Sequence, residues 1–354
     1  MSAAADPDLR QFLLRIPKVE LHVHLEGSMQ PGTLLRLARR HGIDLPASDE
    51  AGLRDWFRFR DFDHFVEIYL TCSRCVKDPE DFQLLVRDFM AEQARQNVVY
   101  SEVHFTIATH IAYGRNGQEI QHAIWEAIEE GEQRERVGMR LIPDMVRDVG
   151  PKMGDVTLRW AVEGRGRGVV ALGLTGREAV YDNEPFRGIF AAAAAEGLRR
   201  VAHAGEHAGP ASVRSALAVV GAERIGHGVR SIEDPALVEE LAARQVPLEI
   251  CPTSNVRLGI APSIAEHPFD RLRRAGVAVS VNSDDGPMFN TTLTEEYVRL
   301  AEAFGYSAPD MAGLALASLR HSFLPPDDKA RMEADFRRQF AALGAEILGQ
   351  AVEV

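Results

Sequence analysis

Short apolar segments of strand length recur along the chain, and a helical pattern follows each of them. The first is the alternating stretch Val19–Leu25 within PKVELHVHLEG. The other segments are Val98–Phe105, Met139–Val146, Val169–Thr175, Arg200–Ala204, Glu223–His227, Val246–Cys251 and Val277–Asn282. Strands that alternate with helices form parallel sheets through right-handed crossovers, and eight such units close into a barrel. We therefore predict the α/β class and a (β/α)8 TIM barrel.

The long interval between the first two strands holds several helical patterns, at Gln30–Gly42, Phe62–Val76 and Pro79–Gln96. This predicts extra helices inserted after the first strand. A doubly wound sheet is the alternative, but that fold normally carries a glycine-rich phosphate turn after an early strand, and here the first strand ends in His-Leu-Glu-Gly. Because no linker or repeat interrupts the sequence, we expect residues 1–354 to form a single domain. The apolar helical tail Asp327–Val354 is expected to pack on the barrel.

Charge and apolar content argue against several kinds of partner. The chain has 52 acidic and 40 basic residues, a formal net charge of −12, so its surface would repel a nucleic-acid backbone. No apolar run approaches the length of a membrane span, and residues 1–18 lack the apolar core of a signal peptide. Three cysteines do not make a disulfide framework, so we expect a cytoplasmic protein. Cys72 and Cys75 form a C-x-x-C without a second pair, and we interpret them as helix packing.

Histidines and acidic residues gather where the predicted strands end. His22 and His24 are two residues apart, so both project from one face of the first strand. The other strand ends carry His104, Asp144, His203-Ala-Gly-Glu206, Gly226-His227-Gly228, Cys251-Pro-Thr-Ser-Asn255 and Ser283-Asp284-Asp285-Gly286. Catalytic groups of such barrels lie at the carboxyl ends of the strands, so we expect these side chains at one mouth. We predict that the histidines outside this pattern are structural: His41, His64, His110, His122, His207, His267 and His321.

Three imidazoles and one carboxylate at that mouth suit a divalent metal, and zinc in particular. We predict that His22, His24, His203 and Asp284 hold the ion. Many hydrolytic barrels carry a second metal bridged by a lysine or glutamate after the fourth strand, but that strand here ends in Leu172–Gly176, with neither. One zinc ion per chain is therefore expected, and it would lower the pKa of a bound water toward neutrality.

Three further residues are candidates for proton transfer and substrate contact. Glu206 follows His203 by three positions and could donate a proton if burial raises its pKa. His227 lies between two glycines, which lets the backbone turn sharply and present its ring to the attacking water or to developing charge. Asp284 and Asp285 are adjacent and diverge, so one would bind the metal and the other the substrate.

The chain resembles the adenosine deaminase family of zinc-dependent hydrolases, which belongs to the amidohydrolase superfamily. The resemblance is carried by ELHVHLEG (Glu20–Gly27), HAGE (His203–Glu206), RIGHG (Arg224–Gly228), CPTSN (Cys251–Asn255) and NSDD (Asn282–Asp285). It implies a (β/α)8 barrel and a zinc site made by the four predicted ligands, of which His24 would also face the substrate. It further implies that Glu206 protonates purine N1 while His227 and Asp284 assist attack at C6. Asp285 would hydrogen-bond purine N7, and the N–H of Gly176 would meet N3.

Departures from strict adenosine deaminases bear on the substrate. Those enzymes have aspartate at the positions of Glu26, which is associated with the ribose 5′-hydroxyl, and of Gly173. Glu26 together with CPTSN is more similar to bacterial relatives that act on free adenine or on 6-amino-6-deoxyfutalosine, an adenine nucleoside, whereas Gly176 favours a nucleoside. Pro287 follows Gly286, so the loop there is expected to differ from that of relatives. Phe62 and Phe65, in an early helix, are candidates for an apolar wall at the sugar side.

We therefore predict hydrolytic deamination of the 6-amino group of an adenine nucleoside (adenosine, 2′-deoxyadenosine or 6-amino-6-deoxyfutalosine). The expected partner is a small-molecule purine, with neither nucleic acid nor membrane, and the sequence does not indicate an oligomeric state. The alternatives are a free-adenine deaminase and a hydrolase of another C–N bond on the same barrel, because fold and metal do not fix the substrate. A non-catalytic binding relative would be expected to lose a ligand or Glu206, and all are present.

Overall fold

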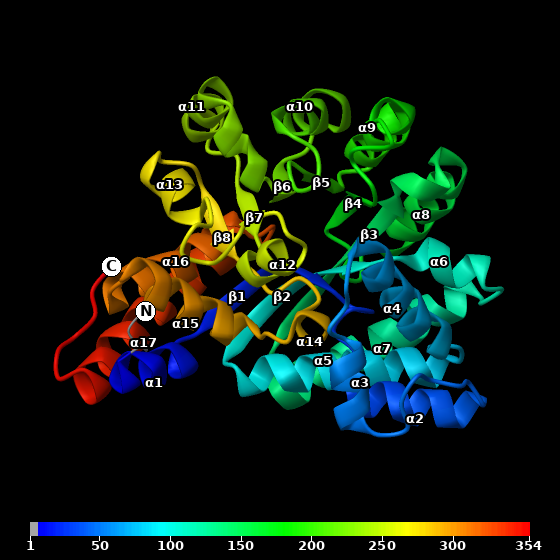
Figure 1. Cartoon of the computed structure of the whole chain (residues 1–354), viewed down its shortest axis with the longest axis horizontal. Helices are drawn as coiled ribbons and strands as arrows, with labels where there is room; N and C mark the ends of the chain where they lie inside the picture. Colours follow the sequence, from blue (N-terminus) through cyan, green and yellow to red (C-terminus); the bar gives the residue numbers. More distant parts are fainter. Residues whose placement is uncertain (1–5) are drawn as a thin grey trace.

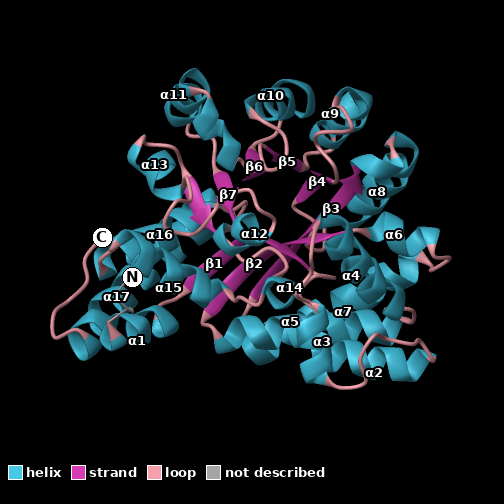
Figure 2. Cartoon of the chain, in the orientation of Figure 1, coloured by secondary structure: helices cyan, strands magenta, loops and turns pink. Residues whose placement is uncertain are grey.

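Eight parallel strands form the centre of the structure, a computed structural model that describes residues 6–354 (Figure 2). Each strand pairs in parallel with the next one along the chain, in the order β1 to β8. The strands are β1 (Lys18–His24), β2 (Val98–Phe105), β3 (Gly138–Val146), β4 (Ala171–Thr175), β5 (Arg199–Ala204), β6 (Arg224–His227), β7 (Leu248–Ile250) and β8 (Val279–Val281). The predicted strand segments and the predicted (β/α)8 barrel are confirmed.

Helices surround the strands on the outside of the barrel (Figure 1). The α-helices are α1 (Pro7–Arg15), α2 (Pro31–His41), α3 (Glu50–Trp56), α4 (Phe62–Cys75), α5 (Pro79–Arg95), α6 (Ile107–Ala112), α7 (Gly117–Glu135), α8 (Pro151–Gly164), α9 (Arg187–Ala195), α10 (Pro210–Ser215), α11 (Pro235–Arg244), α12 (Pro252–Arg257), α13 (Phe269–Arg274), α14 (Gly286–Phe289), α15 (Leu293–Phe304), α16 (Ala308–His321) and α17 (Pro326–Ile347). Short 3-10 turns are η1 (Arg147–Val149), η2 (Glu184–Phe186) and η4 (Val229–Glu233), and η3 (Ala216–Val220) is a π-helical turn.

The extra helices predicted after the first strand are α2, α4 and α5, and the structure adds the short helix α3, which was not predicted; all four lie together on one side of the barrel (Figure 1). At the opposite end of the chain, α17 packs on α1 and α16 through the buried rings of Phe336 and Phe340, as the apolar tail predicted. Cys72 and Cys75 are free thiols on the buried face of α4, which confirms their interpretation as helix packing. None of the helices between residues 6 and 354 is long and apolar enough to cross a membrane.

The barrel closes between β8 and β1 through side-chain and backbone hydrogen bonds. Asn282 Oδ1 accepts the backbone N–H groups of Leu21 (2.9 Å) and His22 (3.1 Å). Two residues further on, the N–H of Asp284 donates to the carbonyl of His22, and the carbonyl of Asp284 accepts the N–H of His24, both at 3.1 Å. The first and last strands, more than 250 residues apart in sequence, are thereby held side by side.

Replacing Asn282 by alanine should destabilise the barrel strongly. Asn282 is fully buried, so its loss leaves two strand N–H groups without an acceptor, at about 1–3 kcal/mol each. We expect the free energy of unfolding, measured by urea denaturation, to fall by about 2–6 kcal/mol. Asn116→Ala is the control, because it removes an exposed cap of α7 that accepts from Gln118 and Glu119, at about 1 kcal/mol. Equal losses in the two variants would contradict a closing role for Asn282.

Candidate active site

The candidate metal ligands come from three strand ends and meet at one point. His22 and His24 end β1, His203 lies in β5, and ring nitrogens of the three histidines lie within 4.8 Å of one another. Asp284, just after β8, places Oδ1 3.4 Å from His24 Nε2 and 3.7 Å from His22 Nε2. All four side chains are buried. The structure thus brings together the residues that the strand ends predicted.

The protonation of these rings fits a divalent metal. Burial lowers the pKa of His22 and His203 well below the usual range, and neighbouring imidazoles lower it further. The rings are therefore neutral at physiological pH, which is the form that binds metals. His22 Nε2 and His203 Nδ1 are buried without a hydrogen-bond partner among residues 6–354. Unsatisfied ring nitrogens beside a carboxylate suit a cation that accepts nitrogen and oxygen ligands.

Unusual backbone conformations aim two of the site residues. His227 and Asp284 have φ angles of +61° and +64°, a region that residues other than glycine rarely occupy and that clusters at functional sites. Gly226, which precedes His227, leaves room for His22 and His203, because a Cβ at this position would lie 2.8 Å from His22 Cε1 and 3.2 Å from His203 Cα. Gly226 therefore permits close approach of β1, β5 and β6, and Gly228, with φ of +68°, permits the turn after His227.

Glu206 lies in the turn after β5 and faces two histidines. Its Oε1 lies 3.7 Å from His227 Nε2, and its Oε2 lies 3.1 Å from His207 Nδ1. Burial raises the pKa of Glu206, but the neighbouring His227 and the hydrogen bond from His207 outweigh burial and lower it to about 2. The sequence predicts proton donation by Glu206 only if burial raises this pKa, and the neighbouring histidines reverse that rise. Glu206 is a carboxylate at neutral pH and must receive a proton before it can donate one.

A chain of hydrogen bonds fixes the tautomer of His227. The N–H of Phe269 donates to His267 Nδ1 (3.0 Å), so His267 Nε2 carries the proton and donates to Asn255 Oδ1 (3.1 Å). The amide Nδ2 of Asn255 then donates to His227 Nδ1 (3.2 Å). With Nδ1 as an acceptor, the neutral ring of His227 carries its proton on Nε2. That proton points toward Glu206.

Asp285 is the second carboxyl group that faces the cavity. It is buried, and its Oδ1 has no hydrogen-bond partner among residues 6–354. Burial and the adjacent Asp284 charge raise its pKa well above the usual range, so at neutral pH it can hold a proton and donate a hydrogen bond. Gly27 makes this position possible, because a Cβ there would lie 1.5 Å from Asp285 Oδ1.

A cavity of about 280 Å³ opens over these groups. His24, Asp284 and Asp285 line its inner end, and Phe62, Phe65 and Gly176 line its walls, together with Glu206 and His227. The two phenylalanines lie on α4, whose Phe65 ring stacks on Phe289 (5.2 Å between centroids). Phe62 and Phe65 were expected to form an apolar wall at the substrate site, and both line this cavity.

Glu26 lies behind the cavity wall rather than on it. Its carboxylate is fully buried and accepts hydrogen bonds from the N–H of Thr106 (3.0 Å), His110 Nε2 (3.2 Å) and the hydroxyl of Tyr69 (3.2 Å). Glu26 is not among the residues that line the cavity, whereas Tyr69 is. Both Tyr69 and Thr106 line the cavity, so they lie between Glu26 and a ligand.

Sequence reasoning missed three residues at the site. Glu178 accepts the backbone N–H groups of Gly205 (2.6 Å), Glu206 (3.1 Å) and His207 (3.2 Å), and so shapes the turn after β5. His207, predicted to be structural, instead lines the cavity and contacts Glu206. Glu249 in β7 contacts His22. A sequence signal existed for Glu249 alone, as an acidic residue within an apolar strand segment.

Comparisons with known proteins agree with this geometry. The family model described as adenosine deaminase matches residues 17–337. The aminodeoxyfutalosine deaminase of Streptomyces avermitilis is 39% identical over 337 residues, which cover 95% of this chain and 94% of that protein. The solved adenine deaminase of Arthrobacter aurescens has a TM-score of 0.87 and 32% identity, over 91% of this chain and 98% of that one. Arabidopsis ADAL, solved in complex with IMP, has a TM-score of 0.83 and 25% identity, over 92% and 97%. On its sequence and its barrel, this chain belongs to the adenosine deaminase family.

Proposed function

We propose that this protein is a metal-dependent hydrolase that removes the 6-amino group of an adenine nucleoside as ammonia and leaves the 6-oxopurine. The observation that carries the proposal is one cavity that joins the cluster His22, His24, His203 and Asp284 to the carboxyl groups of Glu206 and Asp285. The likeness to an aminodeoxyfutalosine deaminase supports a nucleoside, and the likeness to a protein solved with IMP supports a purine ligand.

In this proposal His22, His24, His203 and Asp284 hold one zinc ion per chain. Neutral imidazoles with one carboxylate are a ligand set that zinc takes in hydrolases. A bound zinc ion would supply Lewis-acid chemistry that lowers the pKa of a water molecule toward neutrality. The remaining steps fall to the side chains around it.

Glu206 and His227 handle protons and orient the water. Glu206 enters the reaction as a carboxylate, because its pKa is about 2. It takes a proton from the attacking water and passes it to purine N1, which makes C6 more electrophilic. The second proton of that water goes to the 6-amino group as the C6–N bond breaks, so ammonia leaves and the 6-oxo group remains. The Nε2 proton of His227, 3.7 Å from Glu206 Oε1, donates to the oxygen that attacks C6 and stabilises its charge.

Asp285 and Gly176 orient the purine ring. The protonated carboxyl of Asp285 donates to N7, an acceptor, and the backbone N–H of Gly176 donates to N3. Gly176 lies on the cavity wall with φ of +95°, a conformation that favours glycine. Phe62 and Phe65 then cover the sugar side with apolar surface.

A deaminase of free adenine is the second candidate, supported by the likeness to the Arthrobacter enzyme. The extent of the cavity favours the nucleoside. Its lining continues past the buried carboxyls to Leu70, Val149 and Arg177, which are partly exposed. A purine base placed at the inner end leaves that outer part for a sugar and its 5′ substituent. A single domain over residues 1–354, a cytoplasmic location and the absence of a nucleic-acid partner stay predictions from sequence.

Glu206→Gln should abolish most turnover while the protein still binds zinc. Glutamine keeps the size and removes the proton carrier, and general acid–base catalysis contributes about 10²–10⁴-fold. We expect kcat for adenine nucleosides to fall by about that factor, measured by loss of the adenine absorbance and release of ammonia. Zinc content should equal that of the unchanged protein. A near-normal kcat would remove Glu206 from the proton-carrying role.

Gly27→Ala should displace Asp285 and weaken substrate orientation. The added Cβ would lie 1.5 Å from Oδ1 and 2.4 Å from Cγ of Asp285, so that side chain must move. A misplacement of about 1 Å can cost about 100-fold in rate, and we expect kcat/KM to fall by that order. Gly188→Ala in α9 is the control, because nothing lies within 4 Å of its added Cβ. The same kcat/KM in both variants would exclude orientation by Asp285.

A substrate panel separates the two candidates. We expect adenosine, 2′-deoxyadenosine or 6-amino-6-deoxyfutalosine to exceed adenine in kcat/KM by about tenfold or more, because the sugar gains apolar contact. Phe65→Ala should lower the ratio of kcat/KM for the nucleoside to kcat/KM for adenine, since it removes part of the apolar wall over the sugar. Higher kcat/KM for adenine than for every nucleoside would favour the second candidate instead.

A further inference from the structure

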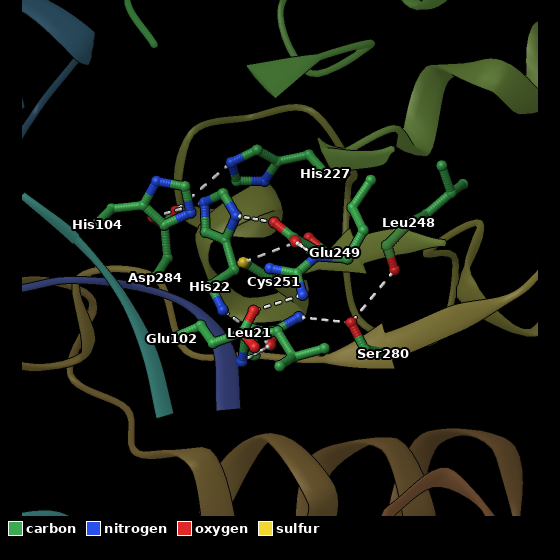
Figure 3. Close-up of polar contacts among 12 residues, drawn as sticks. Leu21, His22, Glu102, His104, His227, Leu248, Glu249, Cys251, Ser280 and Asp284 are labelled. Atoms are coloured by element: carbon green, nitrogen blue, oxygen red, sulfur yellow. Dashed lines mark hydrogen bonds and ion pairs between the residues drawn. The ribbon is translucent and has the colours of Figure 1, made fainter. Parts of the chain in front are cut away.

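The ring of His22 has a different partner on each side (Figure 3). Its Nε2 faces the cavity end, 3.7 Å from Asp284 Oδ1. Its Nδ1 lies 2.8 Å from Glu249 Oε2, and both side chains have zero exposure to solvent. The other imidazole of β1 lacks such a partner, because His24 Nδ1 lies 3.7 Å from Asp144, beyond hydrogen-bond distance.

We propose that Glu249 is a positioning residue that fixes the tautomer of His22 and thereby sets the affinity of the site for zinc. The carboxylate accepts a hydrogen bond only from Nδ1–H, and this leaves the Nε2 lone pair free for the metal. The inference rests on the zinc site of the proposed function. Nothing else in the geometry of His22 selects that tautomer, since Nε2 has no hydrogen-bond partner among residues 6–354.

Arg224 prevents the Glu249 carboxylate from rotating. Its Nε donates to Glu249 Oε1 at 2.5 Å, and its Nη1 donates to Glu102 Oε2, also at 2.5 Å. The guanidinium also lies over the ring of Phe323, 3.8 Å from the centroid, and all three charged side chains are buried. One oxygen of Glu249 is thus committed to Arg224, and the other oxygen is committed to His22.

The charges of this network also favour a cation. Two carboxylates, Glu102 and Glu249, face a single guanidinium in the buried interior of the barrel. The pairing leaves one negative charge in excess, and Glu249 presents it to the far side of a metal-binding ring. A carboxylate behind a ligating histidine raises the basicity of the ring, and its loss typically costs 10–100-fold in metal affinity.

Glu249→Gln tests the proposal on metal affinity rather than on turnover. Arg224 requires an acceptor, so the amide oxygen of the glutamine must face Arg224 and its NH₂ group must face His22 Nδ1. His22 then becomes an acceptor at Nδ1, which places its proton on Nε2 and blocks the metal. We expect the Kd for Zn²⁺ to rise about 10–100-fold, measured on metal-free protein by competition with a chromophoric chelator.

Glu102→Gln is the matched control. It removes the same charge from the same Arg224, but Glu102 hydrogen-bonds Arg224, Tyr100 and the N–H of Phe323 and does not contact His22. We expect its Kd for Zn²⁺ to stay within about threefold of the unchanged protein. Equal weakening in both variants would overturn the proposal, because the effect would then come from net charge and not from the hydrogen bond to His22.

Glu249→Gln neutralises one of the two carboxylate partners of Arg224, so a second variant covers the case in which this change prevents folding. Glu102→Gln/Arg224→Met/Glu249→Leu removes all three buried charges together, a replacement that proteins often tolerate. His22 still loses its acceptor there, and the Kd should again rise about tenfold or more. An unchanged Kd in any folded variant at position 249 overturns the proposal. Failure of the unchanged protein to bind Zn²⁺ would instead overturn the zinc site of the proposed function.

Discussion

The hydrogen bonds that close the barrel between β8 and β1 are the constraint on which the site depends. Asp284 uses its backbone N–H and its carbonyl on His22 and His24, and Asn282 adds a side-chain bridge two residues before it. The positive φ of Asp284 belongs to this junction. Because the backbone on both sides is held, its carboxylate stays 3.4–3.7 Å from the two imidazoles. The first and the last strand of the barrel therefore form the site together.

The fold and the convergence of the candidate ligands could be predicted because both follow from local rules. Strand-length apolar segments that alternate with helices specify the barrel, and the carboxyl ends of its strands share one face. His22 and His24 needed only the period of two along a strand to be placed on one side. His203 and Asp284 could be assigned to the same site because both lie at the carboxyl ends of predicted strands, and no interatomic distance was needed. These inferences depend on topology and not on the packing of particular side chains.

The supporting residues could not be found in that way, because they depend on contacts between distant segments. Glu178 caps the turn after β5 from a loop that precedes α9, and nothing near it in sequence marks that role. The family resemblance implied a substrate contact for Glu26, yet Tyr69 of α4 stands between it and the cavity. Helix α4 is inserted between the first two strands, and the sequence does not show how it packs.

The two carboxyl groups of the cavity illustrate why the sign of a pKa shift needs the structure. Both are buried, so burial raises both pKa values, but Glu206 faces histidines and Asp285 faces Asp284. The neighbours reverse the shift in the first case and increase it in the second. When the pKa values of two nearby carboxyl groups shift in opposite directions, one group acts as a proton acceptor and the other as a proton donor. In the proposed reaction this division suits a purine, whose N7 requires a donor while the attacking water requires an acceptor.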